Sequence, residues 1–462
     1  MKKTFSIGGV HPNDSKISAN CGITVLPVPP TVYISMAQHL GAPAVPVVAA
    51  GDKVKAGQVI GEPAGFISAF VHSSVSGTVK SVGPRQDLAG NNAVHVEIAV
   101  EGDEWAEGID LSDKIVRDIP DNETIVSRIK AAGVVGLGGA TFPTHVKLCP
   151  PPGKKADFLI LNGAECEPYL TSDYRIMLEK PEQIVVGAEI MRRVLGNPRT
   201  IIAIEDNKPE AIRTMSAAVD KLRVMSSEYG TIEIVPLKKK YPQGGEKQLI
   251  EAVTRRQVKS MGLPIDVGAV VQNVATALAV YDAVQKNKPL TTNVLTVTGD
   301  CLGGMNQRNY LYRIGTPLSH IIEQTGGIPE KAVKVISGGP MMGKAVSNLD
   351  ATTVKGSSSI LYLTAEQTVR KPESSCIRCG KCAEACPMGL EPFLLNRLAR
   401  HGMTDELEEN AVHDCIECGC CLYTCPANIP LLDVIRIAKG DVIKIIRGRQ
   451  AAAKAAAEAA KK

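Results

Sequence analysis

Two cysteine runs near the C-terminal end of the chain have the spacing of metal ligands. Each run has three cysteines separated by two residues, then a fourth cysteine followed by proline: Cys376, Cys379, Cys382 and Cys386, and Cys415, Cys418, Cys421 and Cys425. Three closely spaced thiolates can bind three corners of one [4Fe–4S] cube, and the fourth cysteine of such a run usually ligates the other cube. The spacing therefore predicts two clusters, one on Cys376, Cys379, Cys382 and Cys425, and one on Cys415, Cys418, Cys421 and Cys386.

Two other uses of these cysteines fit the pattern less well. Structural zinc sites usually pair two hooks of two cysteines, and they need neither a third cysteine at this step nor a Cys-Pro ending. Disulfides need an oxidising compartment, whereas residues 1–12 contain no apolar stretch of the kind found in a secretory signal. We therefore expect a chain that carries electrons in a reducing environment.

The remaining sulfur-containing residues and two histidines are expected to be structural. Cys420 breaks the two-residue step and is interpreted as a spare thiol, and four more cysteines are expected to be buried small hydrophobes: Cys21, Cys149, Cys166 and Cys301. Cys166 is the one that could also oxidise or touch a cofactor, because it lies in a pocket motif described below. Met341–Met342 are expected to pack in the core, and His11 and His39 to form hydrogen bonds in turns.

Composition excludes several classes of protein. With 462 residues, of which 44% are hydrophobic and 22% charged, the chain should form about three soluble globular domains. A net charge of +4 and only 4% aromatic residues indicate no nucleic-acid binding. The most apolar window, residues 267–284, is interrupted by Gln272, Asn273 and Asp282, so we expect no membrane span.

Hydrophobic patterning divides the chain into parts with different secondary structure. Residues from about 20 to 105 and from 291 to 350 have the alternation and glycine punctuation of short strands. Between them, apolar runs suited to buried parallel strands alternate with amphipathic stretches, which predicts a doubly wound α/β domain. The runs are 156–162, 200–205 and 231–236, and the stretches are 182–195 and 209–225. Between the two cysteine runs the pattern is helical, at 390–400 and 405–409.

A glycine-rich loop precedes the first of these buried runs. Residues 133–147 read GVVGLGGATFPTHVK. Clustered glycines let backbone N–H groups approach a phosphate or a flat ring, and a helix that follows adds positive potential. The usual dinucleotide-binding fingerprint has a strand immediately before its glycines, whereas here a helical segment precedes them. Taken alone, the loop could equally be a tight turn.

Three further segments help to interpret the glycine-rich loop. They are residues 162–168, 241–246 and 272–276. Together these segments closely resemble the FMN-binding region of the complex I flavin subunit. The resemblance implies an FMN pocket formed by Gly136, Gly138, Gly139, Ala140, Lys147, Asn162, Glu165, Gly245, Asn273 and Thr276. It places Phe142, Glu167 and Glu246 on the NAD(H) side of that pocket.

The whole chain resembles a further family more closely, the RnfC proteins of the Rnf electron-transport complex. The resemblance covers residues 5 to 435 and includes Gly8-Gly-Val-His11-Pro12, the flavin region, the segment 338–343 and both cysteine runs. It implies four parts: a barrel-sandwich hybrid domain (1–115), an FMN-binding α/β domain (116–288), a soluble ligand-binding β-grasp module (289–355) and a helical ferredoxin-like domain with two [4Fe–4S] clusters (365–435). Beyond them, the composition after Arg449, almost entirely alanine and lysine, predicts a helical or disordered tail (436–462). The hybrid fold also occurs in lipoyl and biotinyl carriers, but the corresponding segment here, 71–76, contains no lysine to modify.

The family resemblance also implies a function. We expect a peripheral protein on the cytoplasmic side of the cell membrane that reacts with NAD(H) and passes electrons through FMN and two [4Fe–4S] clusters to a partner subunit. The partners would be the other subunits of a ferredoxin:NAD oxidoreductase complex that exports Na⁺ or H⁺, including a ferredoxin-like iron–sulfur subunit. The alternative is a soluble cobalamin reductase of the microcompartment type, although that relative lacks the Gly-Gly-x-His-Pro entry and the hybrid domain.

Overall fold

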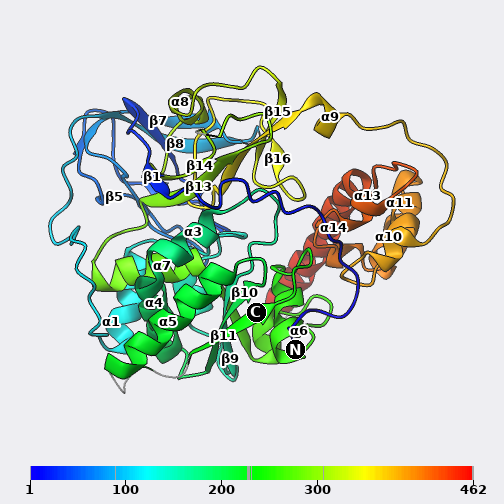
Figure 1. Ribbon diagram of the computed structural model, residues 1–462, viewed down its shortest axis with the longest axis horizontal. Coiled ribbons are helices and arrows are strands. Elements are labelled where there is room, and N and C mark those ends of the chain that lie inside the picture. Colours follow the sequence, from blue (N-terminus) through cyan, green and yellow to red (C-terminus); the bar gives the residue numbers. More distant parts are fainter. Residues whose placement is uncertain (1, 89, 226–228, 230–231, 305, 460–462) are drawn as a thin grey trace. The chain divides into compact units, whose positions relative to one another are not determined.

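The computed structural model describes residues 2–88, 90–225, 229, 232–304 and 306–459, and Figure 1 labels their helices and strands. The chain forms two compact units. The first contains Met1–Lys3, Asp14–Lys238 and Pro264–Thr368, and the second contains Thr4–Asn13, Lys239–Leu263 and Val369–Lys462. Both units are therefore assembled from segments that are far apart in the sequence.

The hybrid module of the first unit is built from two small antiparallel sheets. One has the order β2-β8-β7-β4 and the other β3-β5-β6. The strands are β2 (Thr31–Ser35), β3 (Val45–Pro46), β4 (Lys53–Val54), β5 (Val59–Glu62), β6 (Val71–His72), β7 (Gly77–Gln86) and β8 (Asn92–Val100). Inward-facing residues of both sheets, such as Val32, Ile60 and Ile98, form one apolar core. Residues 71–76 are all buried, so the segment that corresponds to the carrier tip is part of this core.

A parallel sheet with the order β11-β10-β9-β12 forms the centre of the α/β domain. Its strands are β9 (Phe158–Gly163), β10 (Arg199–Glu205), β11 (Ile232–Leu237) and β12 (Ala269–Asn273). The helices of the domain are α1 (Asn122–Ala131), α2 (Thr144–Lys147), α3 (Ser172–Glu179), α4 (Pro181–Val194), α5 (Pro209–Met225) and α7 (Val274–Gln285), with the 3₁₀ turn η1 (Pro264–Val267). The strands are largely apolar because helices cover a parallel sheet; α4, for example, packs against α5 and α7.

The β-grasp module contributes a mixed sheet with the order β1-β14-β13-β17-β15-β16. The elements are β1 (Ile23–Val25), β13 (Thr292–Thr298), β14 (Arg308–Arg313), α8 (Leu318–Gln324), β15 (Ala332–Ser337), β16 (Lys344–Ala345), β17 (Ser359–Thr364) and α9 (Ala365–Thr368). The edge strand β1 comes from the N-terminal part of the chain and pairs in parallel with β14. The module is therefore completed by residues that lie outside its own stretch of sequence.

A buried lysine fixes the start of the glycine-rich loop. Lys355 is 1% exposed, and its Nζ donates hydrogen bonds to the carbonyl oxygens of Phe70 (2.8 Å) and Gly133 (2.7 Å). Its backbone N–H donates to Gln38 Oε1 (3.0 Å). Burial lowers the pKa of this lysine to about 7 because water no longer stabilises the charged form. Lys355 thereby ties the hybrid module to Gly133, where φ is +61° and the glycine loop begins.

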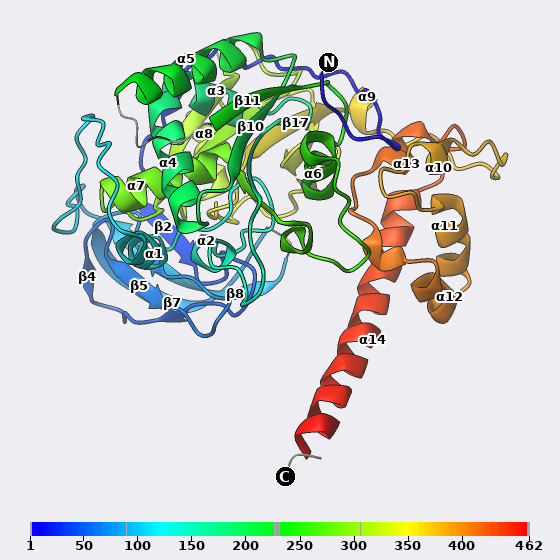
Figure 2. The same ribbon diagram turned by 90° about the horizontal axis from the view of Figure 1, so that it is seen from below.

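The second unit is mainly helical. Its elements are α6 (Glu246–Thr254), α10 (Lys381–Glu384), α11 (Pro392–Arg400), α12 (Thr404–Glu409), η2 (Val412–Asp414), α13 (Cys420–Thr424) and α14 (Leu431–Ala459), and Figure 2 follows α14 to the C-terminal end. Two distant segments hold the cysteine-bearing part: the backbone N–H of Gly9 donates to the carbonyl oxygen of Ala385 (2.9 Å), and Gln248 Nε2 donates to that of Pro387 (3.1 Å). Among the described residues, no helix is both long and apolar enough to cross a membrane.

Several sequence expectations differ from the structure. Residues 239–263, expected in the α/β domain, pack in the second unit, because their partners are backbone groups of the cysteine-bearing segment. The tail does not begin at residue 436, because it belongs to helix α14, which already begins at Leu431. Residues 460–462 and the first residue of the run 231–236 lie outside the described part of the chain. Met342 is 47% exposed rather than in the core. None of Cys21, Cys149, Cys166 and Cys301 is fully buried.

Candidate functional site

The predicted cofactor residues of the α/β domain gather where the strand order of its sheet reverses. From β9 the chain proceeds outward through β10 and β11, and then returns to the other side of β9 as β12. Asn162 and Asn273 stand opposite each other in the register of β9 and β12, at the C-terminal ends of both strands. Ligands of open α/β sheets bind in the crevice that such a reversal leaves at the carboxyl ends of the strands. The topology thus marks these two asparagines as the centre of a binding site.

The glycine-rich loop borders this crevice. The backbone N–H of Leu137 donates to Thr276 Oγ1 (2.8 Å), which fixes the loop to the first turn of α7. Gly138 has φ of +77°, and a Cβ atom at this position would lie 2.8 Å from Asn273 Nδ2, so only glycine fits. Gly139, by contrast, has no heavy atom within 4 Å of where its Cβ would be. Residues 138–140 are exposed, so the tip of the loop is open to a ligand.

A chain of hydrogen bonds connects the loop to the acidic residues after β9. The side chain of Asn273 caps α7 by accepting from the backbone N–H of Ala275 (2.7 Å), and its Nδ2 donates to Asp173 Oδ2 (2.7 Å). The backbone N–H of Asp173 in turn donates to Glu165 Oε1 (2.8 Å). A continuous series of contacts therefore connects Gly138 to Glu165 through Asn273 and Asp173. The sequence had not indicated Asp173, which belongs to no recognised motif and lies in the first turn of α3.

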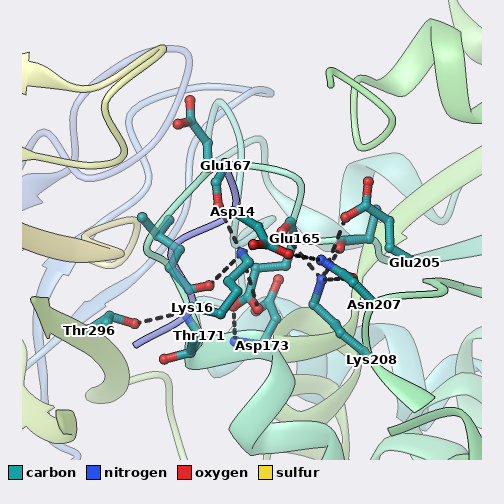
Figure 3. A network of polar contacts seen from close by, with 12 residues as sticks. Asp14, Lys16, Glu165, Glu167, Thr171, Asp173, Glu205, Asn207, Lys208 and Thr296 are labelled. Atoms are coloured by element: carbon teal, nitrogen blue, oxygen red, sulfur yellow. Dashed lines mark hydrogen bonds and ion pairs between the residues drawn. The ribbon is translucent and has the colours of Figure 1, made fainter. Parts of the chain in front are cut away.

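Glu165 lies in a buried cluster of charges (Figure 3). Its side chain is 3% exposed and lies 4.0 Å from Lys16 Nζ. Lys208 Nζ lies 3.6 Å from Glu205 Oε2 and donates to the carbonyl oxygen of Ala164 (2.7 Å). Burial raises the pKa of Glu165 to about 7, and the two lysines oppose that rise. Neither lysine belonged to a recognised sequence motif.

Glu167 has a different environment from the one its resemblance implies. Its carboxylate accepts hydrogen bonds from the backbone N–H groups of Met342 (2.8 Å) and Met341 (3.2 Å) in the β-grasp module. A Cβ atom on Gly339 would lie 2.1 Å from Glu167 Oε2, so the glycine is needed for this approach. Glu167 thus joins the α/β domain to the loop 338–343, and its assignment to NAD(H) stays a prediction.

Two buried polar atoms at the crevice have no hydrogen-bond partner among the described residues: Glu165 Oε2 and Gln272 Nε2. Buried polar groups are nearly always paired, so these atoms and the free space over Gly139 fit a polar, flat cofactor such as FMN. Of the other predicted cofactor residues, Gly136 donates its N–H to the carbonyl oxygen of Phe142 (2.8 Å), and Lys147 is the last residue of α2. Gly245 and Glu246 belong to the second unit, at the start of α6.

The second unit brings together the cysteines predicted for one of the two clusters. Cys386 of the first run and Cys415, Cys418 and Cys421 of the second line a single pocket. Its remaining wall is mostly apolar and includes Leu390, Leu395, Leu432 and Ile435. Of the other predicted set, Cys382 and Cys425 are half-buried, whereas Cys376 and Cys379 are exposed. Cys386 therefore lies with the second run, as the crossed arrangement predicts, and the ligand assignment of both clusters stays a prediction.

Two side chains outside the predicted ligand set support the wall of this pocket. Tyr241 is 2% exposed, and its hydroxyl donates to the carbonyl oxygen of Cys418 (2.9 Å). Cys420 is fully buried, and its thiol lies 4.0 Å from the carbonyl oxygen of Tyr241. Cys420 thus faces the segment 239–263, although it also lines the pocket. Hydrogen bonds around a cluster tune its reduction potential.

Comparison with known families assigns each part of the chain to a domain type. The matching family models are the RnfC barrel sandwich hybrid domain (residues 3–104), the Nuo51 FMN-binding domain (129–282), the SLBB domain (295–345) and the 4Fe-4S dicluster domain (368–426). A chain of the NAD⁺-reducing [NiFe]-hydrogenase in its H₂-reduced state has a similar fold, with a TM-score of 0.51 and 20% identity over 68% of this chain and 61% of that one. Fold and sites define a multidomain flavin and iron–sulfur electron-transfer protein.

Relatives over nearly the full length identify the family. The chain is 47% identical to a subunit of the proton-translocating ferredoxin:NAD(+) oxidoreductase complex of Clostridium ljungdahlii, over 88% of this chain and 87% of that protein. It is 42% identical to the corresponding subunit of the Na(+)-translocating complex of Acetobacterium woodii (94% and 96%), and 41% identical to that of the ion-translocating oxidoreductase complex of Rhodobacter capsulatus (95% and 83%). The chain belongs to this family, the RnfC proteins of the ion-translocating oxidoreductase complexes.

Proposed function

We propose that this chain is the NAD(H)-reacting subunit of a ferredoxin:NAD(+) oxidoreductase complex that couples electron transfer to translocation of Na⁺ or H⁺. The observation that carries the proposal is the crevice at the strand reversal, where the glycine loop, Asn162, Asn273 and Thr276 meet in a chain that also has a four-cysteine pocket. The full-length relatives support the reaction. No comparison favours the cobalamin reductase alternative.

The residues of the crevice have distinct tasks in this proposal. Gly139 leaves room for a ring or phosphate against the backbone, Gly138 allows the close approach of Asn273, and Lys147 and the N-terminus of α7 supply positive potential. Glu165 supplies a buried carboxylate oxygen, Oε2, that accepts no hydrogen bond from the described residues. FMN, when bound, supplies the exchange between two-electron hydride chemistry and the single electrons that iron–sulfur clusters accept. The chain's own contribution is to bind, orient and keep water away.

A glycine substitution tests the flavin site without disturbing the fold. Because a Cβ atom at Gly139 would have no heavy atom within 4 Å, Gly139→Val should leave folding intact and abolish FMN binding. Anaerobically purified protein should contain about one FMN and about eight iron atoms per chain, and the variant should retain the iron. Full flavin occupancy in the variant would contradict the assignment. As a control, Gly153→Val alters another exposed glycine with free space around it, although its φ of +81° makes a small loss of stability expected there.

We further propose that the protein attaches peripherally on the cytoplasmic side of the membrane through other subunits, including a ferredoxin-like iron–sulfur subunit. The chain alone should not transport ions, because an ion cannot cross a bilayer without a membrane-spanning partner. Isolated protein should reduce dyes with NADH but should give no NADH-linked ion uptake into plain liposomes. Recovery of all active chain in the soluble fraction, with free cobalamin as the best acceptor, would favour the reductase instead.

A further inference from the structure

An N-terminal segment outside the flavin domain lies along the loop that follows β9. We call residues 14–18 the strap. The backbone N–H of Tyr169 donates to the carbonyl oxygen of Asp14 (2.9 Å), and Asn207 Nδ2 donates to Asp14 Oδ2 (3.2 Å). At the other end, the hydroxyl groups of Ser18 and Thr171 are 2.6 Å apart. The match to the FMN-binding family covers residues 129–282, so the strap supplies contacts that the flavin domain by itself does not contain.

Lys16 makes the central contact of the strap. Its Nζ donates to three carbonyl oxygens of one loop, those of Glu165 (2.8 Å), Glu167 (2.8 Å) and Leu170 (2.6 Å) (Figure 3). All three ammonium protons are therefore used. The loop contains two non-glycine residues with positive φ, Glu165 (+47°) and Tyr169 (+70°). Such backbone conformations persist only when surrounding contacts hold them, and Lys16 is well placed to do so.

The same ammonium group balances charge inside the cluster. The charged and titratable groups around Glu165 come from several elements: Lys16 from the strap, Glu205 from β10, Lys208 from the turn after β10, Asp173 from α3, and Cys166 from the loop itself. The two lysines face three carboxyl groups, all of them largely buried. Burial lowers the pKa of Lys16 to about 8 and raises that of Glu165 to about 7. Removing Lys16 would therefore raise the pKa of Glu165 further, because an attractive charge is lost.

We propose that Lys16 is a positioning residue of the flavin pocket, which holds the loop 165–170 in its binding shape and balances the Glu165 carboxylate. The effect reaches the glycine loop through the hydrogen bonds from Glu165 to Asp173, from Asp173 to Asn273, and the close approach of Asn273 to Gly138. The inference rests on the proposed flavin site, and it assigns part of that site to a segment of the hybrid region.

The test is the dissociation constant for FMN of the full chain, measured from the fluorescence of released flavin. Lys16→Met should weaken FMN binding at pH 8 by about tenfold or more, and Lys16→Gln, which keeps an amide NH₂ with two donor hydrogens but no charge, should lie between the unaltered chain and Lys16→Met. The control is Lys2→Met, the same change at a lysine whose side chain is 63% exposed and whose ion pair with Asp206 lies at the surface. It should bind FMN as the unaltered chain does, and all variants should keep their iron.

A pH series and a second substitution separate charge balance from a purely structural role. In Lys16→Met the defect should grow from pH 6 to pH 7.5, where Lys16 of the unaltered chain is still mostly charged, as the uncompensated Glu165 carboxyl loses its proton. Adding Glu165→Gln should remove that pH dependence and restore part of the affinity at pH 8. A defect of equal size at every pH that Glu165→Gln does not change, or unaltered affinity in Lys16→Met, would overturn the inference. If the unaltered chain bound no FMN, the proposed function would fail first, and the inference with it.

Discussion

Replacing Glu167 by glutamine should release the loop 338–343 of the β-grasp module. The carboxylate accepts from two backbone N–H groups, those of Met342 at 2.8 Å and Met341 at 3.2 Å. A hydrogen bond to a charged group contributes about 1.5–3 kcal/mol, and glutamine offers one acceptor oxygen, so at least one bond is lost. Since 1.4 kcal/mol corresponds to a factor of ten, the two amides should exchange with deuterium roughly 10- to 150-fold faster.

The assay is hydrogen–deuterium exchange of peptides that contain residues 338–343, followed by mass spectrometry. Gly339→Ala attacks the same contact from the other side, because its Cβ would lie 2.1 Å from Glu167 Oε2. It should give the same local pattern, and the double variant should be no worse than either single one. Gly303→Ala is the matched control, since a Cβ there meets no atom within 4 Å. If Glu167→Gln left exchange unchanged and instead weakened the reaction with NADH, the carboxylate would belong to the nucleotide and not to the loop.

Three further outcomes are expected. Burial lowers the pKa of Lys355 from 10.5 to about 7, so the folded state is disfavoured at any pH at which this lysine must be protonated. The free energy of unfolding should therefore rise from pH 7 to pH 9 by up to about 1.4 kcal/mol per pH unit. Urea titrations of Lys355→Met should not show this rise. Tyr241→Phe removes the donor to the carbonyl oxygen of Cys418, and potentiometry should show a lower potential for one cluster at unchanged iron content. Cys386→Ser should lose about half of the iron, whereas Cys420→Ser should keep all of it; equal losses in these two variants would contradict the ligand assignment.

The strands and helices that depend on local hydrophobic periodicity were predicted correctly from the sequence. Runs at 156–162 and 200–205 became β9 and β10, and the stretch at 209–225 became α5, because buried strands and amphipathic helices show their period directly. The helical character of the segment between the cysteine runs was likewise confirmed. The convergence of Asn162 with Asn273 was expected only from the resemblance to the complex I flavin subunit, because the run that forms β12 was not recognised as a strand.

The contacts that the sequence did not predict involve partners that have no sequence signature. Lys16 and Lys208 bind backbone carbonyls, and any residue offers a carbonyl, so no spacing announces the contact. The second unit was missed for a related reason: the bond from Tyr241 to Cys418 joins positions 177 residues apart, beyond any local pattern. Met342 follows an apolar strand and was expected in the core, but the turn at Gly338–Gly339 directs its backbone N–H towards Glu167 and leaves its side chain outside.

The discontinuous second unit has a consequence for the order of events during synthesis. Thr4–Asn13 is synthesised before Lys239–Leu263, with which it pairs through the backbones of Val10 and Tyr241, and both segments also contact Val369–Lys462, which is synthesised after them. Domains generally fold as units in the order of their synthesis, but this one cannot close until Val369–Lys462 has been synthesised. Until then, the hydrogen-bond donors of Gly9, Tyr241 and Gln248 lack the acceptors that they have in the folded unit. Iron–sulfur insertion into the four-cysteine pocket should therefore follow synthesis of Val369–Lys462, because the pocket is lined by residues 386–435.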